Sequence, residues 1–589
     1  MGPQETNTPE QVREATSAIR RTTAVSVAGV MNSNPIGSAR PLLSVVVPAR
    51  DSAPWLGEAL ESILNQEVPD LEVLVVDNGS TDGTASVVED IVSRDQRVRW
   101  IGSEARSAGS ARNDGVQAAR GEFLVFADAD DIVPDGAYRA MLDSLVSSGS
   151  DMVIGDHLKF SADRTWSPTR RWYRFDSPRS GLRPEEAPAL LSGRPCWNRM
   201  FRRSFWDGAA LRFPEVQSVE DIEPMTRAFI EARSIDVVPN CVYLYRDRGD
   251  TTSLSVRADA PATVRYLEQE RACAALVREQ PALRAQHGEI VLDADGWSHL
   301  HRFLSTNPSD DDIAAVGQAA AALLSEIPID GLARVAPIRR ALWHLVLGGE
   351  WSAARSFVLR SSGESETDRL ASWLDAVAST QRSDAASAGA LAVEGLVPAF
   401  VNGAEGIPVA WFVDRVTAIA DVELPPTGSA LPDAMIAALR AAEPVAVPMV
   451  SALRRVLPLV IDRVEASARG LVVGGSADLF GLEALGTLGL TGPSGASTTP
   501  LHEVPGGWRA DLTDEGLTPG RYSVSVSFDG VTGSFPVVTA RMPLPPVDED
   551  LPMQPLADRK DGWRFLVDLR TPRRRGVAGL LRAVRRRVG

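Results

Sequence analysis

Three aspartates, Asp128, Asp130 and Asp131, follow one short apolar run at residues 123–126. That continuous run predicts a buried parallel strand, which would deliver the three carboxylates to its exposed carboxyl end. Carboxylates crowded together without a partner repel one another and raise one another's pKa. The cluster therefore favours a hard divalent cation held by oxygen ligands and bridging to a phosphate. The alternative is that these acidic residues only cap the helix that follows.

Two more acidic residues stand at the ends of predicted strands. Asp51 ends the apolar segment that starts at Leu42, and Asp77 follows the strand at residues 71–76. Further strands are expected at VRWIGS and DMVIGDHLKF, and amphipathic helical segments separate the strands. This alternation predicts a doubly wound α/β sheet, in which ligands bind outside the carboxyl ends of the strands. The acidic strand ends would then meet at one edge of the sheet.

These segments, taken in order, resemble the family 2 glycosyltransferases, which have the GT-A fold. The motifs that carry the resemblance are SVVVPARD, VVDNGSTDGT, SARNDG, GEFLVFADADD, PCWNRMFRRSFW, VEDIEPM and YLYRDRGDTTSLS. The resemblance covers roughly residues 42–255, and we expect a GT-A domain at residues 41–258. It implies a nucleotide-sugar donor, with a uridine diphosphate sugar favoured, and Mn²⁺ or Mg²⁺ as cofactor. It also implies inversion at the anomeric carbon.

The same resemblance assigns residues to the donor. Asp77 would accept hydrogen bonds from the nucleoside, and Asp130, with Asp128, would bind the metal. A metal there would neutralise charge on the departing diphosphate. The full donor-side set is Pro48, Arg50, Asp51, Asp77, Asn78, Arg112, Asp128, Arg246 and Arg248. Arg50, Asp51 and Asn78 depart from the usual family pattern, which leaves the identity of the bound base open.

Catalysis is assigned to the VED segment. Asp221 matches the family's catalytic base, which would remove the proton from the acceptor hydroxyl, and Glu220 would support it. Without the resemblance, acidic residues here are explained by a helix N-terminus, where negative charge is favoured. Trp197 and Asn198 are expected on the acceptor side, although core packing is the competing role for the tryptophan.

The remaining chain predicts a disordered leader at residues 1–40, a helical region at 259–455 and a small immunoglobulin-like β-sandwich at 456–545. In the sandwich, LTPGRYSVSVSF resembles a tyrosine corner built on Tyr522. Residues 546–589 are expected to form a Pro-rich linker and a basic amphipathic tail, and the tail has an anionic membrane surface as its candidate partner. The order of these parts resembles the bacterial wall teichoic acid glycosyltransferases.

Composition limits the classes of partner. The net charge of −16 argues against general nucleic-acid binding, because phosphate neutralisation needs a basic surface. Three cysteines without metal-ligand spacing favour a reducing compartment. The cysteine content favours a cytoplasmic enzyme, and the basic tail suggests a peripheral location on the inner face of the membrane. The resemblance implies a cell-envelope glycan or teichoic-acid-like polymer as acceptor. A noncatalytic carbohydrate-binding scaffold is the alternative, and homo-oligomerisation is left open.

Overall fold

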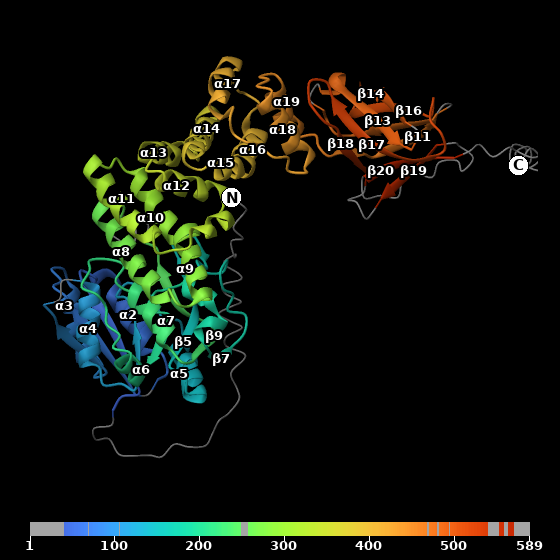
Figure 1. Ribbon diagram of the computed structural model, residues 1–589. Helices are drawn as coiled ribbons and strands as arrows, with labels where there is room; N and C mark the ends of the chain where they lie inside the picture. The colour runs from blue at the N-terminus through green and yellow to red at the C-terminus, as the bar shows by residue number, and fades with distance from the viewer. Residues whose placement is uncertain are drawn as a thin grey trace, which may run out of the picture. The chain divides into compact units, whose positions relative to one another are not determined.

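The computed structural model describes residues 40–570 with short gaps (Figure 1). The described ranges are 40–68, 70–104, 107–248, 257–467, 470–479, 482–493, 495–539, 553–558 and 564–570. The chain divides into two compact units, Met1–Arg339 and Arg340–Gly589, and each is described by itself. The expected leader at 1–40, apart from Arg40, and the basic tail beyond residue 570 lie outside the described residues.

The first unit is built on a mixed sheet with the order β3-β2-β1-β4-β8-β5-β9-β7, and β6 pairs with β5. Its strands are β1 (Leu43–Ala49), β2 (Leu71–Asp77), β3 (Val98–Gly102), β4 (Phe123–Phe126), β5 (Met152–Phe160), β6 (Thr165–Trp166), β7 (Arg179–Leu182), β8 (Arg199–Arg202) and β9 (Ile235–Arg246). Its longer helices are α2 (Ala53–Leu64), α3 (Thr84–Arg94), α4 (Ala108–Ala118), α5 (Ala137–Ser148), α6 (Arg203–Gly208), α7 (Ile222–Glu231), α8 (Ala260–Val277), α9 (Pro281–Asp293), α10 (Asp295–Ser305) and α11 (Asp310–Leu324).

The GT-A-like α/β domain is confirmed, but its sheet is not wholly parallel. β1, β2, β3 and β4 are parallel, whereas β8 lies antiparallel between β4 and β5. β8 is only Arg199–Arg202, within the PCWNRMFRRSFW motif, so it is too short to show a strand pattern in the sequence. Because β8 is antiparallel to both neighbours, β5 runs in the same direction as β4. The carboxyl ends of β1, β2, β4 and β5 therefore share one edge of the sheet.

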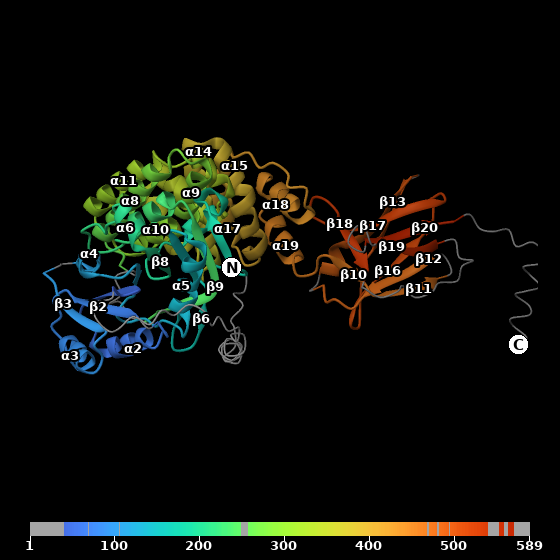
Figure 2. The same cartoon turned by 90° about the horizontal axis from the view of Figure 1, so that it is seen from below.

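Helices cover both faces of this sheet. Figure 2 shows α2 and α3 on one face of β2 and β3, and α4 on the other. β1 and β4 are completely buried, which agrees with their continuous apolar sequences. The contact between α4 and β1 is very close, because a Cβ added at Gly115 would lie 2.4 Å from Val46 Cγ1. This glycine lets α4 carry the SARNDG motif directly over the central strand.

The second unit begins with helices. They are α12 (Pro337–Leu347), which starts at the boundary, α13 (Trp351–Arg360), α14 (Glu366–Ser383), α15 (Ala385–Leu391), α16 (Val397–Gly403), α17 (Val409–Val416), α18 (Ala430–Arg440) and α19 (Ala446–Leu453). α15 continues through a π-helical turn into α16. This stretch, Ala385–Gly403, has the length and apolar composition to cross a membrane, and it is half buried within the fold. It packs against α14, α18 and α19, which also fits a core helix.

Two β-sheets complete the second unit. Their strands are β10 (Leu459–Ile461), β11 (Arg463–Ser467), β12 (Gly470–Gly475), β13 (Gly486–Gly492), β14 (Gly495–Pro500), β15 (His502–Val504), β16 (Gly507–Thr513), β17 (Gly520–Phe528), β18 (Phe535–Thr539), β19 (Met553–Asp558) and β20 (Arg564–Leu569). One sheet has the order β10-β18-β20-β17-β13-β14, with β19 on β20, and the other has β11-β12-β16-β15.

The β-sheet region agrees with the sequence in one feature and extends beyond it in another. The Tyr522 hydroxyl donates to the backbone oxygen of Thr518 at 2.8 Å, as a tyrosine corner requires. β19 and β20, however, lie after residue 545 and pair with each other, and β20 pairs with β17. Backbone pairing therefore carries the sheet past the expected boundary, and an immunoglobulin-like sandwich as such is not confirmed.

Candidate active site

Asp51 ties the loop after β1 to the loop after β2, and Asp77 holds the loop after β2 from within. Asp51 Oδ1 accepts from the backbone N–H of Thr81 at 2.8 Å, and Asp77 Oδ1 accepts from that of Ser80 at 2.9 Å. Asp51 has a φ of 47°, a left-handed conformation that aspartate tolerates better than most residues. Asp51 therefore shapes this edge by joining two loops, and Asp77 keeps a half-buried carboxylate there.

The other residues expected beside these loops differ in exposure. Pro48 is buried within β1, whereas the Arg50 side chain is 57% exposed, with its Nε 3.8 Å from Asp51 Oδ2. Asn78 is buried, and its side-chain oxygen has no hydrogen-bond partner among the described residues. A buried polar atom without a hydrogen-bond partner destabilises the fold, so a ligand N–H or O–H group that reached this oxygen would be bound favourably.

The cluster after β4 holds two partly exposed carboxylates above a buried one. The side chains of Asp128 and Asp130 are 26% and 25% exposed, whereas Asp131 is buried. Burial, and then repulsion from Asp128, raises the pKa of Asp130. Burial raises the pKa of Asp131 further, with repulsion from Asp130 and Asp128 adding to it. A divalent cation with oxygen ligands would offset the unfavourable charge at Asp130, and Asp128 offers a second, partly exposed carboxylate beside it. Asp128 and Asp130 therefore fit the metal expected here.

Two arginines at the end of β9 brace this cluster. Arg246 donates through its backbone N–H to Asp131 Oδ1 at 2.7 Å and through Nε to the backbone oxygen of Asp130 at 2.8 Å. Its Nη2 also donates to Glu58 of α2. Arg248 lies with Nε 3.3 Å from Asp130 Oδ2, and its guanidinium stacks over Trp55 at 4.8 Å. Arg246 is thus committed to holding the loop, and Arg248 is the one that touches a candidate metal ligand.

Arg112 of α4 is buried between two carboxylates. Its Nη2 donates to Asp128 Oδ1 and its Nη1 to Glu220 Oε1, each at 2.6 Å. Burial alone would lower the pKa of Arg112, but the surrounding acidic groups, including Asp128, Glu220 and Asp221, raise it well above its usual value. Arg112 therefore remains charged and links the cluster after β4 to the VED segment. The sequence predicted a diphosphate clamp here, and the structure gives the guanidinium two protein partners.

Asp221 lies directly before α7, as its N-cap, and Glu220 precedes it. Burial raises the pKa of Asp221 to about 7, with Glu220 adding to the rise and Arg112 opposing it. A carboxylate with this proton affinity is suited to accept a proton near neutral pH. Val219, two residues before Asp221, has a φ of 57°. A β-branched residue in this region is strained, and such strain clusters at functional sites.

Trp197 and Asn198 lie beneath the site, in the core. The Trp197 ring stacks on Tyr243 with centroids 4.2 Å apart, and Asn198 Nδ2 donates to the backbone oxygen of Gly155 at 2.9 Å. Both residues are buried. These contacts therefore support a packing role for Trp197, which was the alternative to the acceptor role expected from the sequence. Tyr243 in turn accepts at its hydroxyl from the backbone N–H of Asp128 at 2.8 Å.

Several residues that build the site were not predicted. Tyr243, Glu58, Trp55 and Val219 each contact or adjoin an expected residue, as described above. Asn113 joins them, because its side chain donates to the backbone oxygen of Phe213 and accepts from the same residue's N–H, at 2.8 and 3.0 Å. Tyr243, Asn113 and Val219 lie inside motifs that the sequence had marked, which was the available signal. Glu58 and Trp55 lie outside those motifs, and only the fold brings them to the site.

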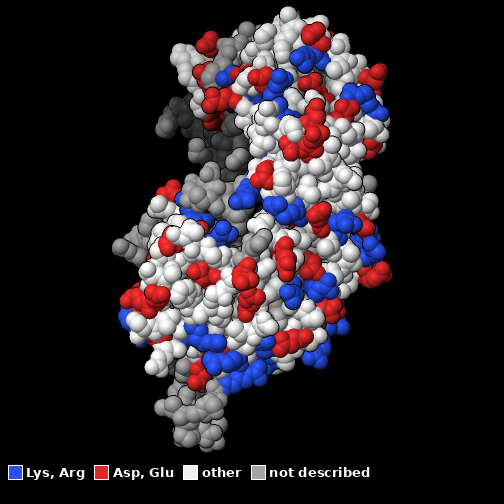
Figure 3. Space-filling view, turned by 90° about the vertical axis from the view of Figure 1, so that its left-hand side faces the viewer, with Lys and Arg blue, Asp and Glu red and all other residues white. Residues whose placement is uncertain are grey.

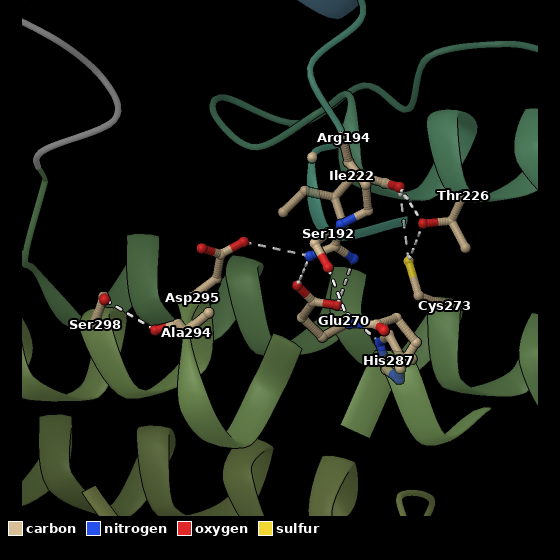
Figure 4. A network of polar contacts seen from close by, with 12 residues as sticks. Ser192, Arg194, Ile222, Thr226, Glu270, Cys273, His287, Ala294, Asp295 and Ser298 are labelled. Carbon is tan, nitrogen blue, oxygen red and sulfur yellow. Dashed lines mark hydrogen bonds and ion pairs between the residues drawn. The ribbon is translucent and has the colours of Figure 1, made fainter. Parts of the chain in front are cut away.

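A second buried cluster lies between the loop before β8 and the helices α8, α9 and α10 (Figure 4). Arg194 donates to both carboxylate oxygens of Glu270, at 2.6 and 2.8 Å, and His287 Nε2 lies 2.9 Å from one of them. Glu270, Cys273 and His287 are near enough to share a metal, with ligand atoms within 4.8 Å of one another. Because Arg194 occupies both oxygens of Glu270, the cluster fits a buried ion-pair network that fastens helices α8, α9 and α10 to the α/β domain.

On the face drawn in Figure 3, acidic and basic side chains are interspersed over most of the surface. The site itself has a mixed charge, because carboxylates of the strand ends alternate with Arg112, Arg246 and Arg248. Such an arrangement can bind a diphosphate through a metal and arginines while keeping one carboxylate, Asp221, as a base.

Comparison with known proteins agrees with this geometry. Residues 44–208 match the model described as Glycosyl transferase family 2. A protein named as the uncharacterized glycosyltransferase EpsJ of Bacillus subtilis is 29% identical over 39% of this chain and 67% of its own length. The succinoglycan biosynthesis protein ExoO of Rhizobium meliloti is 30% identical over 37% of this chain and 64% of its own. The chain thus spans about two thirds of these relatives.

Solved structures of TarS from S. aureus are also similar. The segment 1–349 in complex with UDP-GlcNAc is 20% identical, covers 54% of this chain and 90% of that one, and has a TM-score of 0.44. A longer TarS structure covers 90% of this chain and 85% of that one, at 14% identity and a TM-score of 0.45. By the family model and the relatives in sequence, residues 44–208 of this chain are similar to glycosyl transferase family 2.

Proposed function

We propose that this protein is an inverting, metal-dependent glycosyltransferase that moves a sugar from a nucleotide-sugar donor to a hydroxyl group of a cell-envelope glycan or teichoic-acid-like polymer. A uridine diphosphate sugar is the donor we favour. The observation that carries the proposal is the position of Asp221, whose pKa is raised by burial to about 7 and which lies beside the Arg112 bridge to Asp128. One buried guanidinium thus holds a candidate metal ligand, Asp128, and Glu220, the residue next to the proposed base.

Each residue has a chemical task in this reaction. Asp221 accepts the proton of the acceptor hydroxyl as its oxygen forms a bond to the anomeric carbon. The bond from that carbon to the diphosphate oxygen breaks on the opposite side, which inverts the configuration. Bound metal supplies a positive charge that stabilises the leaving diphosphate. Asp128 and Asp130 would hold it, and Arg248 adds a charged donor on the same side.

Arg112 and Arg246 have positioning tasks. Arg112 fixes Glu220 and Asp128, so that the base segment and the cluster after β4 keep one relative geometry. Arg246 fixes the backbone at Asp130 and the side chain of Asp131. Such preorganisation lowers the cost of aligning the acceptor oxygen with the anomeric carbon.

The test is donor hydrolysis by the purified protein over a panel of nucleotide sugars with Mn²⁺, comparing the unaltered protein with Asp130→Ala. We expect slow hydrolysis of one donor, which the substitution removes because the metal loses a carboxylate. Hydrolysis that survives Asp130→Ala and chelation of the metal would contradict metal dependence. If no donor in the panel binds or reacts, the noncatalytic carbohydrate-binding scaffold becomes the better description.

The cellular setting is proposed with the reaction. Nucleotide sugars are made in the cytoplasm, and acceptors of the cell envelope are assembled at the inner face of the membrane, so the enzyme would act there. The relative ExoO is named for the biosynthesis of succinoglycan, a polysaccharide, which supports an acceptor of this kind. Fractionation of cells into cytosol and membranes, with and without the basic residues after 570, would test the peripheral membrane location.

A further inference from the structure

The segment that follows β5 carries an unusual set of side chains. Residues 164–175 contain four arginines and four aromatic residues and no acidic residue, in a chain whose net charge is −16. The arginines are Arg164, Arg170, Arg171 and Arg174, and the aromatic residues are Trp166, Trp172, Tyr173 and Phe175. The four arginines are exposed, and the four aromatic side chains are half-buried. Arginine and aromatic residues gathered in this way are more typical of a binding surface than of a solvated surface loop.

The segment is held in a defined conformation. β6 pairs antiparallel with the end of β5, with Trp166 opposite Lys159. The backbone oxygen of Thr169 accepts from the N–H groups of Trp172 and Tyr173 at 2.8 and 3.0 Å. Arg171 pairs with Asp293 of α9, and Tyr173 packs edge-on against Phe175 at 5.0 Å. The remaining arginines are therefore presented from an ordered scaffold.

The segment leaves the sheet at the edge that holds the active site. Phe160, the last residue of β5, lies under the guanidinium of Arg246 at 4.8 Å, and Arg246 binds Asp130 and Asp131. On the other side, Lys159 lies over the Tyr245 ring at 4.7 Å, and that ring stacks on Trp197 at 5.8 Å. A short chain of contacts thus connects the segment to the residues beneath the site.

The charges of this segment are only partly engaged within the protein, because Arg171 pairs with Asp293, and Arg164 and Arg170 interact electrostatically with Asp163 and Asp156. Arg164 stacks on Trp166 at 4.6 Å, which leaves its N–H groups able to bind an anion, and Arg171 stacks on Trp172 at 4.0 Å. Within the described ranges, no carboxylate lies within 4.0 Å of Arg164, Arg170 or Arg174 in an ion pair. Guanidinium groups bind phosphate oxygens in bidentate fashion, and aromatic faces bind sugar or polyol carbons.

We propose that residues 164–175 bind an anionic acceptor polymer linked by phosphodiesters, with the arginines on its phosphates and the tryptophans on its carbon units. This rests on the proposed function and, of the two acceptors named there, selects the phosphate-linked polymer over an uncharged glycan and assigns it a binding surface. Several phosphates bound along the segment would hold the polymer while one of its hydroxyl groups reaches Asp221. An uncharged glycan would leave the arginines without partners.

The experiment measures binding of fluorescently labelled poly(glycerol phosphate) to the full-length protein by anisotropy, at low and at high salt. Dextran of similar length is the uncharged comparison. We expect tight binding of the phosphate polymer at low salt, weaker binding at high salt because exposed charges are screened, and weak binding of dextran at both. The double variant Arg170→Gln/Arg174→Gln should bind the polymer roughly 2- to 30-fold more weakly, from the usual strength of exposed charge pairs.

A control is Arg94→Gln on α3, which also removes an exposed charge but lies outside the segment and should leave the affinity unchanged. The charge reversal Arg170→Glu should lose more affinity than either glutamine, and its circular dichroism and melting temperature check that it folds. Equal affinity of the double variant and the unaltered protein, or tighter binding of dextran, would overturn the inference. Arginine-dependent binding to phosphatidylglycerol vesicles without polymer binding would also overturn it, in favour of a lipid surface.

Donor hydrolysis by the unaltered protein, measured in the same preparation, keeps the two proposals apart. Loss of hydrolysis with intact polymer binding would count against the transferase mechanism alone. Hydrolysis with no arginine-dependent polymer binding would count against the acceptor surface alone.

Discussion

Arg112 and Glu220 lie 108 positions apart in the chain and form a buried hydrogen-bonded ion pair at 2.6 Å. The same guanidinium holds Asp128, so α4 joins the cluster after β4 to the segment that carries Asp221. A planar guanidinium can serve two carboxylates at fixed angles, which a flexible ammonium group cannot. The Arg112 bridge therefore explains how the loop after β4 and the VED segment keep a fixed position relative to each other.

Replacement of Arg112 by lysine should therefore lower kcat by at least tenfold and lower the melting temperature. Lysine retains the charge but cannot bridge Asp128 and Glu220 in the same planar geometry, and one buried carboxylate loses its partner. Steady-state kinetics and thermal unfolding give the two readouts. Arg227→Lys is the matched control, because Arg227 pairs with Glu223 at the more exposed side of α7. If both variants behave alike, the bridge has no positioning role.

Asp221→Asn should abolish sugar transfer while nucleotide-sugar binding persists. Asparagine has nearly the same shape but cannot accept the proton of the acceptor hydroxyl, so we expect a fall in kcat of at least 10²- to 10⁴-fold. Isothermal titration with the donor checks that binding remains. Transfer at more than a tenth of the original rate would assign the base to another residue.

The rate should depend on pH through the same carboxyl group. Because burial raises the pKa of Asp221 to about 7, its reactive, ionised form is scarce at pH 5. We expect kcat/KM to rise about tenfold per pH unit up to about 7 and then to level off. A profile that is flat from pH 5 to pH 8 would show that Asp221 does not act as the base.

Protein stability should show the opposite dependence. The folded protein holds the Asp221 proton more tightly than the unfolded chain does, so raising the pH from about 4 through about 7 costs stability. Asp221→Asn removes this cost, and its melting temperature should exceed that of the unaltered protein at pH 8 and approach it at pH 5. Thermal unfolding at both pH values measures the difference.

Val219→Gly should stabilise the fold and slow the reaction. Valine in the left-handed region costs roughly 1–2 kcal/mol, and glycine would remove this strain. Part of the gain is offset, because glycine loses more conformational entropy than valine when the chain folds. We therefore expect a gain of up to about 1 kcal/mol in the free energy of unfolding, together with a lower kcat because the VED segment is less rigid. Denaturant unfolding and kinetics test both halves, and a destabilised variant would show that the strain is not relieved.

Arg194→Met should destabilise the first unit strongly. It would leave Glu270 buried without its cation, and breaking one side of such a pair costs about 3–5 kcal/mol. The loss should be greatest above pH 5, because Arg194 and His287 outweigh burial and lower the pKa of Glu270. Arg94→Met, at an exposed pair with Asp90, is the control and should change stability little. Equal effects would mean that the buried network contributes no more than a surface pair.

The sequence was sufficient for the α/β class and for the residues at the strand ends. Runs such as those of β1 and β4 are apolar throughout because both faces are covered, so they identify central strands without a structure. The VED segment and Asp130 were found because their residue types follow fixed positions in local motifs. Apolar runs and local motifs each involve residues close together in the chain, so they can be recognised from the sequence alone.

Only the tertiary structure decided which partners these residues have. Arg112 and Arg246 were expected on the donor, yet their groups are held by Glu220, Asp128, Asp131 and Glu58, contacts that span 16 to 188 positions. β8 and β19 were placed only by pairing with other strands, because four to six residues carry too little pattern to fix a strand. The WRFLVDL segment was expected to be strand-like, but its place beside β17 follows only from the fold. The proton affinity of Asp221 arises from burial and neighbouring charges, which exist only once the chain has folded.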